Sequence, residues 1–124
     1  MIQNKYQLEV KTKDRTVVPL PKYECTLPAY NHEHQKADFF IFVSLHRDKN
    51  HPNGNDISRY KRAYIVGGMS WQQFEDKKVF WKKDQKDPTN GTVFWTDCWN
   101  VYIRETEPVH NIGKELQRDN CETV

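Results

Sequence analysis

The chain has 124 residues, of which 36% are hydrophobic and 29% charged, and this length fits one globular domain with no room for two independent cores. Aromatic residues make up 13% of the chain, and their buried bulk offsets the entropy of ordering it, which excludes disorder over most of the length. The net charge of +2 is nearly balanced, so it does not by itself indicate nucleic-acid binding, and local clusters of basic residues matter more.

The first predicted element is a strand over residues 5–11, where apolar and polar residues alternate. Leu8 and Val10 lie on one face of this strand, and Glu9 and Lys11 lie on the opposite face, as a period of two requires.

A turn is predicted at residues 14–16, followed by a stretch that three prolines keep irregular and by a short helix over residues 30–36. Residues 38–45 are apolar on both faces, which is typical of the central strand of a parallel or mixed sheet. The connection from the first strand is long enough for the crossover that parallel neighbours need.

A polar loop follows this central strand, and residues 63–67 are predicted to form the third strand. Ser70 and Gln73 have the spacing of a capping box, so a short helix should begin there and end near residues 77–78. Met69 and Phe74 have the positions of the matching hydrophobic staple.

The last predicted elements are a pairing of residues 79–81 with residues 92–96 across an Asn-Gly turn, and a final strand over residues 99–103. We divide the chain into a domain over residues 1–108 and a polar C-terminal tail over residues 109–124. The order of elements predicts a mixed α+β domain, with a central mixed sheet flanked by short helices.

The compartment is predicted from what the sequence lacks. Its longest apolar run, residues 39–43, is too short to cross a membrane, and residues 1–5 lack the apolar core of a signal peptide. Cys25, Cys98 and Cys121 are odd in number and have no C-x-x-C spacing. We therefore expect a cytoplasmic protein with reduced thiols.

The first strand carries the motif with the clearest chemistry, Glu9-Val10-Lys11. A carboxylate at this place can hold Mg²⁺, which polarises a phosphate and lowers the pKa of a bound water. The neighbouring ammonium can orient that water or stabilise the charge of the transition state. On spacing alone, a solvated strand face is the simpler interpretation, because Glu and Lys are common and alternate on exposed strands.

The order of an E-x-K strand, a crossover and an apolar strand resembles the second half of the core of PD-(D/E)XK nucleases, with residues 8–13 and 37–43 as its anchors. The resemblance implies a restriction-endonuclease-like core lacking its N-terminal part. It implies hydrolysis of DNA phosphodiester bonds with Mg²⁺ or Mn²⁺ as cofactor. Glu9 would then be the metal-binding acid and Lys11 the catalytic lysine.

Members of that family also carry an Asp on the strand before E-x-K. Here only eight residues precede Glu9, and none of them is acidic. A homodimer or a second polypeptide would then have to supply the acid. The alternative is a non-catalytic module, derived from the nuclease fold, that binds nucleic acid or a protein.

Five basic residues near the E-x-K strand are the candidate phosphate contacts: Lys13, Arg15, Arg47, Lys49 and Arg59. An ordinary solvated face is the alternative interpretation of each basic cluster.

His32, His34 and Gln35 are candidate second-shell residues of the metal site, with a hydrated loop as the alternative. A zinc site that combines both histidines with Cys25 and Cys98 is a weaker hypothesis, because the spacing of structural zinc sites is absent.

The four tryptophans, Trp71, Trp81, Trp95 and Trp99, have apolar neighbours, so we expect them to pack in the core, although exposed ones could stack on bases.

Overall fold

The computed structural model describes residues 6–32, 37–52 and 56–114. It confirms a mixed α+β fold, in which two three-stranded sheets are accompanied by short helices. In these described segments, every helix is too short or too polar to span a bilayer.

The first sheet is mixed, and the apolar strand lies at its centre as predicted. Strand β1 (Leu8–Arg15) pairs in parallel with β3 (Phe39–Arg47), and β3 pairs antiparallel with β4 (Tyr60–Ser70). Instead of turning at residues 14–16, β1 continues to its pairing with His46, because the ladder with β3 supplies hydrogen-bond partners along its whole length.

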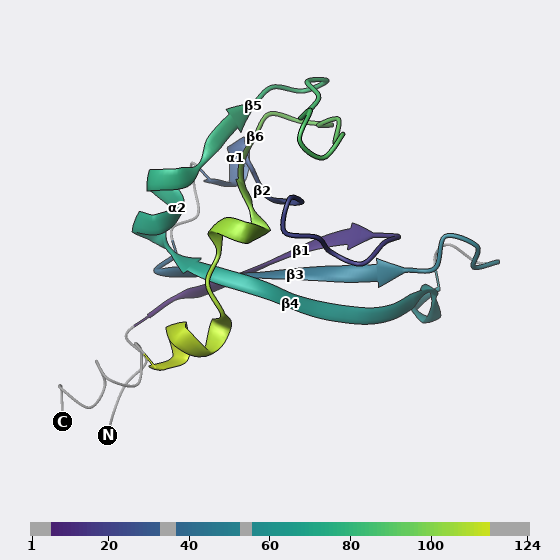
Figure 1. Cartoon of the computed structure of the whole chain (residues 1–124), viewed down its shortest axis with the longest axis horizontal. Helices are drawn as coiled ribbons and strands as arrows, with labels where there is room; N and C mark the ends of the chain where they lie inside the picture. Colours follow the sequence, from purple (N-terminus) through teal and green to yellow (C-terminus); the bar gives the residue numbers. More distant parts are fainter. Residues whose placement is uncertain (1–5, 33–36, 53–55, 115–124) are drawn as a thin grey trace.

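The crossover from β1 to β3 contributes to a second, antiparallel sheet that the sequence did not predict. Within it lie β2 (Glu24–Pro28) and α1 (Ala29–His32). Strand β2 pairs with β6 (Cys98–Tyr102), which also pairs with β5 (Val79–Trp81). Figure 1 shows this sheet rising from one side of the first sheet.

Two predictions for the second half of the chain have different outcomes. The final strand is confirmed as β6, but β5 pairs with β6 and not with residues 92–96. In that segment, Val93 forms an isolated bridge with Lys86. Strand β6 is more buried than residues 92–96, so pairing with β6 places β5 against a neighbour that packs in the core.

The capping box of the predicted helix is confirmed. Helix α2 (Trp71–Lys77) begins after Ser70, whose Oγ accepts from Gln73 N at 3.1 Å, while Gln73 Oε1 accepts from Ser70 N at 2.8 Å. Two 3₁₀ turns, η1 (Ile57–Arg59) and η2 (Ile103–Glu105), precede β4 and follow β6, respectively.

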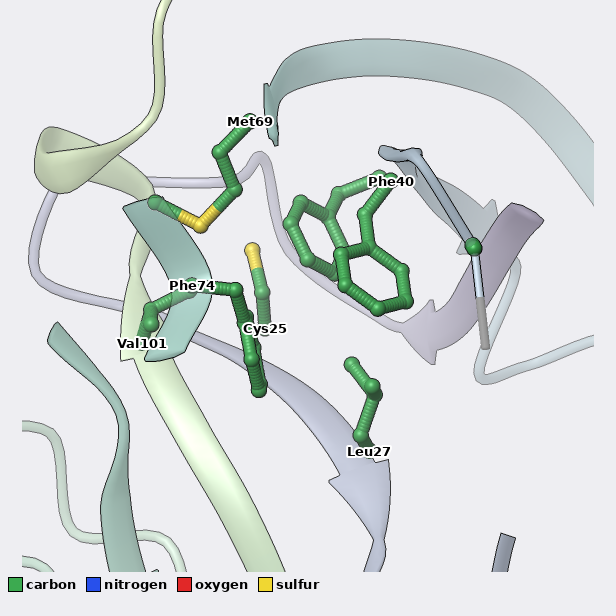
Figure 2. Packing of buried hydrophobic residues seen from close by; sticks show 8 residues of the cluster. Cys25, Leu27, Phe40, Met69, Phe74 and Val101 are labelled. Atoms are coloured by element: carbon green, nitrogen blue, oxygen red, sulfur yellow. The ribbon is translucent and has the colours of Figure 1, made fainter. Parts of the chain in front are cut away.

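The hydrophobic core lies between the two sheets and α2. Phe40 and Phe42 of β3 meet Leu27 of β2, Phe74 of α2 and Val101 of β6, all of them buried. Figure 2 shows Leu27, Phe40, Phe74 and Val101 converging from different elements. The core therefore holds the two sheets together, and the contact of β1 with β2 becomes a fixed part of the structure.

Residues 109–114, assigned to the polar tail by the sequence, are helical. Ile112 is only 1% exposed and lies against Gly68 of β4. A Cβ added to Gly68 would be only 2.5 Å from Ile112 Cδ1. The glycine thus lets the C-terminal segment approach β4 closely. The packed part of the domain extends at least to Ile112.

Candidate nucleic-acid interface

Strand β1 directs its charged face inward. Glu9 and Lys11 pair in register with Phe40 and Phe42, which are buried between the sheets, whereas Val10 is 57% exposed on the outer face. Paired residues of neighbouring strands lie on the same face of a sheet. The polar row of β1 therefore points toward the second sheet.

The E-x-K residues form an ion pair with each other. Lys11 Nζ lies 3.0 Å from Glu9 Oε1, and the two side chains are 17% and 35% exposed, respectively. No cluster of three His, Cys, Asp or Glu residues that could hold a metal ion occurs in the described part of the chain. One carboxylate already paired with an ammonium group is a poor match to the several oxygen ligands that Mg²⁺ prefers, so these residues alone do not fit a magnesium centre.

Further along β1, the polar row meets a buried acid that sequence reasoning missed. Glu24 of β2 is 3% exposed, and its carboxylate forms a salt bridge with Lys13 and accepts a hydrogen bond from Thr92 Oγ1 at 3.0 Å. Burial raises the pKa of Glu24, but Lys13 and Arg15 more than offset this effect and hold the pKa below its ordinary value.

Arg15 is fixed by several partners at the end of β1. Its guanidinium donates to Ser44 Oγ at 2.9 Å and to the carbonyl oxygen of Glu24, and it lies 5.5 Å from the ring centre of Tyr23. These contacts keep the guanidinium in one orientation, and the Arg15 side chain is only 9% exposed, so its positive charge lies just beneath the surface of this end of the sheet.

The other three predicted phosphate contacts lie at the same end of the first sheet. Arg47 ends β3 opposite Tyr60, which begins β4, and Lys49 is exposed in the connecting loop. Arg59 lies just before β4, with its guanidinium 4.4 Å from the ring centre of Tyr60. A hydrogen bond of 2.7 Å from Asp48 N to the carbonyl oxygen of Arg59 closes the loop.

We call this region the basic end and define it by the five predicted residues Lys13, Arg15, Arg47, Lys49 and Arg59. Residues 13–15, Glu24 and residues 47–62 together contain seven Lys and Arg against four Asp and Glu, while the whole chain has 19 against 17. The basic end and its neighbouring segments therefore carry a local excess of positive charge.

A pocket of about 340 Å³ opens at the basic end. Its lining residues are Lys13, Asp14, Arg15, Thr16, Val17, Tyr23, Glu24, Arg47, Asn90 and Thr92. Three of the five predicted phosphate contacts thus share one pocket with a tyrosine ring, and the segment between β5 and β6 forms its far wall.

Of the three polar residues predicted to approach the metal, His32 is the one that the structure describes, and it lies away from the basic end. His32 is buried, with its ring stacked on Trp71 at 4.9 Å and its Nε2 atom 2.9 Å from Glu75 Oε1. Lys78 completes this group with a 2.6 Å salt bridge to Glu75. His32 therefore packs in the core beside α2, and His34 and Gln35 lie outside the described residues.

The two described cysteines, Cys25 and Cys98, are buried free thiols. Burial raises the pKa of Cys25 to about 12 and that of Cys98 to about 11. Neither belongs to a cluster of three candidate ligands within the described residues, so that part of the chain contains no formed zinc site.

The tryptophans divide into two groups. Trp71 and Trp99 pack against the core, and Trp81 lies 5.2 Å from buried Phe94 between ring centres. The expectation of core packing is wrong for Trp95, which is 73% exposed. Only tertiary contacts could distinguish it, because all four have apolar neighbours in the sequence.

Comparison with family models, with curated proteins and with solved structures finds no match to this chain. Function is therefore inferred from the geometry of the basic end and the chemistry of its side chains.

Proposed function

We propose that this chain is a non-catalytic nucleic-acid-binding module that holds the phosphate backbone of DNA through the basic end. The observation that carries the proposal is the convergence of five basic residues, far apart in the sequence, at one end of the first sheet. Phosphate contacts from Lys and Arg supply most of the affinity of such proteins and are independent of base sequence.

Aromatic rings support the same function. Tyr23 and Tyr60 lie against the guanidinium groups of Arg15 and Arg59, at 5.5 and 4.4 Å from the ring centres. The Arg59–Tyr60 pair holds a half-buried guanidinium beside the loop, where its outward side can contact a phosphate oxygen. The Arg15 side chain is 9% exposed and adds positive charge beneath this surface. Arg47 and Lys49 extend the positive surface beyond these pairs.

Binding is favoured over cutting by the way the carboxylates are engaged. Glu9 is paired with Lys11, and Glu24 is held by Lys13, Arg15 and Thr92. A metal would have to break these ion pairs to recruit either acid. We place this activity in the cytoplasm, where the free thiols of Cys25 and Cys98 stay reduced.

The test is fluorescence anisotropy with a labelled 20-base-pair DNA duplex in low salt. The double variant Arg47→Ala/Arg59→Ala should weaken binding at least tenfold, because it removes two phosphate contacts. The matched control, Lys77→Ala/Lys114→Ala, removes two exposed charges at the opposite end of the first sheet and should change the affinity less than twofold. If both double variants weaken DNA binding equally, the loss of affinity follows from the change in net charge alone, and the proposal is refuted.

Hydrolysis of DNA is a second candidate function, favoured by one observation. The E-x-K strand and the apolar strand are parallel neighbours joined by a crossover, which is the arrangement that the nuclease resemblance implies. A partner polypeptide or a second copy of the chain would then add acids beside Glu9 for Mg²⁺ or Mn²⁺.

Plasmid nicking in Mg²⁺ or Mn²⁺ tests this candidate. Activity that disappears in both Glu9→Ala and Lys11→Ala would support it. Activity that survives both substitutions, or no nicking by the native chain with either metal, would refute it for this chain.

A further inference from the structure

The segment between β5 and β6 carries an exposed aromatic surface that the proposed function does not use. Trp95 is 73% exposed and Val93 is 58% exposed, on either side of Phe94, which is 3% exposed. Figure 1 shows this segment as a loop that projects beyond the second sheet. A large exposed aromatic side chain next to another exposed apolar side chain is a feature of binding surfaces.

Hydrogen bonds and packing hold this segment in one conformation. Asp84 N donates to Phe94 O at 2.7 Å, and Phe94 N donates to Gln85 O at 3.0 Å, so the two arms of the loop are joined beside Trp95. Lys83 N donates to Asp97 Oδ1 at 2.9 Å on the other side of the tryptophan. Trp95 is therefore displayed from an ordered backbone.

A buried carboxylate stabilises the rest of the loop. Asp87 is 1% exposed, accepts from Thr89 N at 2.8 Å, and accepts from the Tyr102 hydroxyl group of β6 at 2.8 Å. These bonds tie the tip of the loop to the second sheet. The loop thus has the rigidity that a stacking platform needs.

The charges around Trp95 indicate the class of ligand. Three exposed lysines, Lys82, Lys83 and Lys86, lie in the arm that faces Trp95 and Val93, against two exposed acids, Asp84 in that arm and Asp97 in the arm of Trp95. An exposed indole ring on a loop whose facing arm is rich in exposed lysines matches the pattern by which proteins stack an unpaired base and hold its neighbouring phosphates.

We infer that Trp95, with Lys83 and Lys86, is a stacking site for an unpaired base of a single-stranded nucleic acid. This inference rests on the proposed function, and it extends that function to single strands. Asn90 and Thr92 of the same loop line the pocket at the basic end, so one strand can pass from that pocket to the tryptophan along the loop. The basic end holds backbone phosphates, and Trp95 adds a contact that a base inside a duplex cannot make.

The experiment compares a twelve-residue oligothymidylate with a twelve-base-pair duplex. Trp95→Ala should weaken binding of the oligothymidylate about tenfold and change duplex binding less than twofold, since stacking requires a free base. Trp95→Phe keeps an aromatic ring and should recover most of the loss. Circular dichroism and thermal unfolding verify the fold, which Trp95→Ala should preserve because the side chain is largely exposed.

Tryptophan emission gives an independent readout. Oligothymidylate should quench and shift the emission of the native chain, and Trp95→Phe should remove this change, because Trp71 and Trp99 are partly buried against the core. Equal oligothymidylate affinity of the native chain and Trp95→Ala would overturn the inference, and the surface would then be assigned to a protein partner.

The two proposals fail in different ways. If Trp95→Ala has no effect but Arg47→Ala/Arg59→Ala weakens binding to both ligands, the stacking site is wrong and the basic end stands. If the native chain binds neither ligand, the proposed function is wrong, and the inference of a stacking site at Trp95 is wrong as well.

Discussion

Lys13 on β1 forms a salt bridge with Glu24 on β2, and this pair joins the two sheets of the fold. The Glu24 side chain is 4% exposed and the Lys13 side chain 31%, so the carboxylate is far from water while the ammonium is partly hydrated. Lys13 Nζ also donates to Thr26 Oγ1 at 3.0 Å. A buried charge with this many partners is costly to leave unpaired, which makes the pair sensitive to mutation and to acid.

We expect Glu24→Gln to lower the free energy of unfolding at pH 7 by about 3 kcal/mol, because it removes the charge that Lys13 and Arg15 surround. Urea unfolding measures this loss. The control Asp76→Asn removes an exposed carboxylate of α2 and should cost about 0.5 kcal/mol or less. A loss for Glu24→Gln as small as that of the control would contradict a structural role of the ion pair.

The same ion pair predicts that the free energy of unfolding decreases at acid pH. The pKa of Glu24 in the folded chain lies below the ordinary value of 4.5, so the folded state binds this proton less readily than the unfolded state. Its contribution is present above pH 4.5 and is lost as the pH falls through the lower, folded pKa. The stability difference between the native chain and Glu24→Gln should therefore shrink as the pH falls below 4.5, as urea unfolding at each pH would reveal.

Replacing Gly68 and Gly113 by alanine should change the stability of the protein in opposite directions. A Cβ at Gly68 would lie 2.5 Å from Ile112 Cδ1 and 2.7 Å from the carbonyl oxygen of Phe40, whereas nothing lies within 4 Å of one at Gly113. We expect Gly68→Ala to cost about 2 kcal/mol through overpacking, and Gly113→Ala to stabilise the helical segment by up to about 1 kcal/mol. Thermal unfolding measures both, and a neutral Gly68→Ala would argue against the packing of Ile112 on β4.

Cys25 and Cys98 should resist alkylation in the folded protein. Their pKa values, raised to about 12 and about 11, leave roughly one thiolate in 10,000 and one in 1,000 at pH 8. In a Cys121→Ser background, mass spectrometry should detect no rapid iodoacetamide adduct until guanidinium unfolds the chain. A fast adduct on either thiol under native conditions would show that the core opens locally.

The salt dependence of DNA binding should distinguish the residues of the basic end that contact phosphates from those that are neutralised within the protein. Arg47, Lys49 and Arg59 lie around the loop between β3 and β4, so replacing each by alanine should reduce the slope of log affinity against log salt by about one. Lys13 is already neutralised by Glu24, so Lys13→Ala should change this slope less while lowering stability. An equal change of slope for all five would contradict the internal pairing of Lys13.

Local signals in the sequence determined several elements. Ser70 and Gln73 are close in the chain, so their reciprocal capping bonds predicted where α2 begins. The apolar run of β3 similarly predicted a central strand, because a strand with neighbours on both sides and a covered face needs such residues. The parallel pairing of β1 with β3 followed from the length of the crossover between them.

Only the tertiary structure decided which face of β1 points inward and what its charges meet. Alternation predicts two faces, but the choice depends on the second sheet, whose strand β2 lies in a proline-containing segment with no strand pattern. Glu24 thereby reaches Lys13, and Trp95 reaches solvent while Trp99 packs against the core. The burial and ion pairing of these side chains depend on contacts between residues distant in the chain, and short sequence patterns do not predict such contacts.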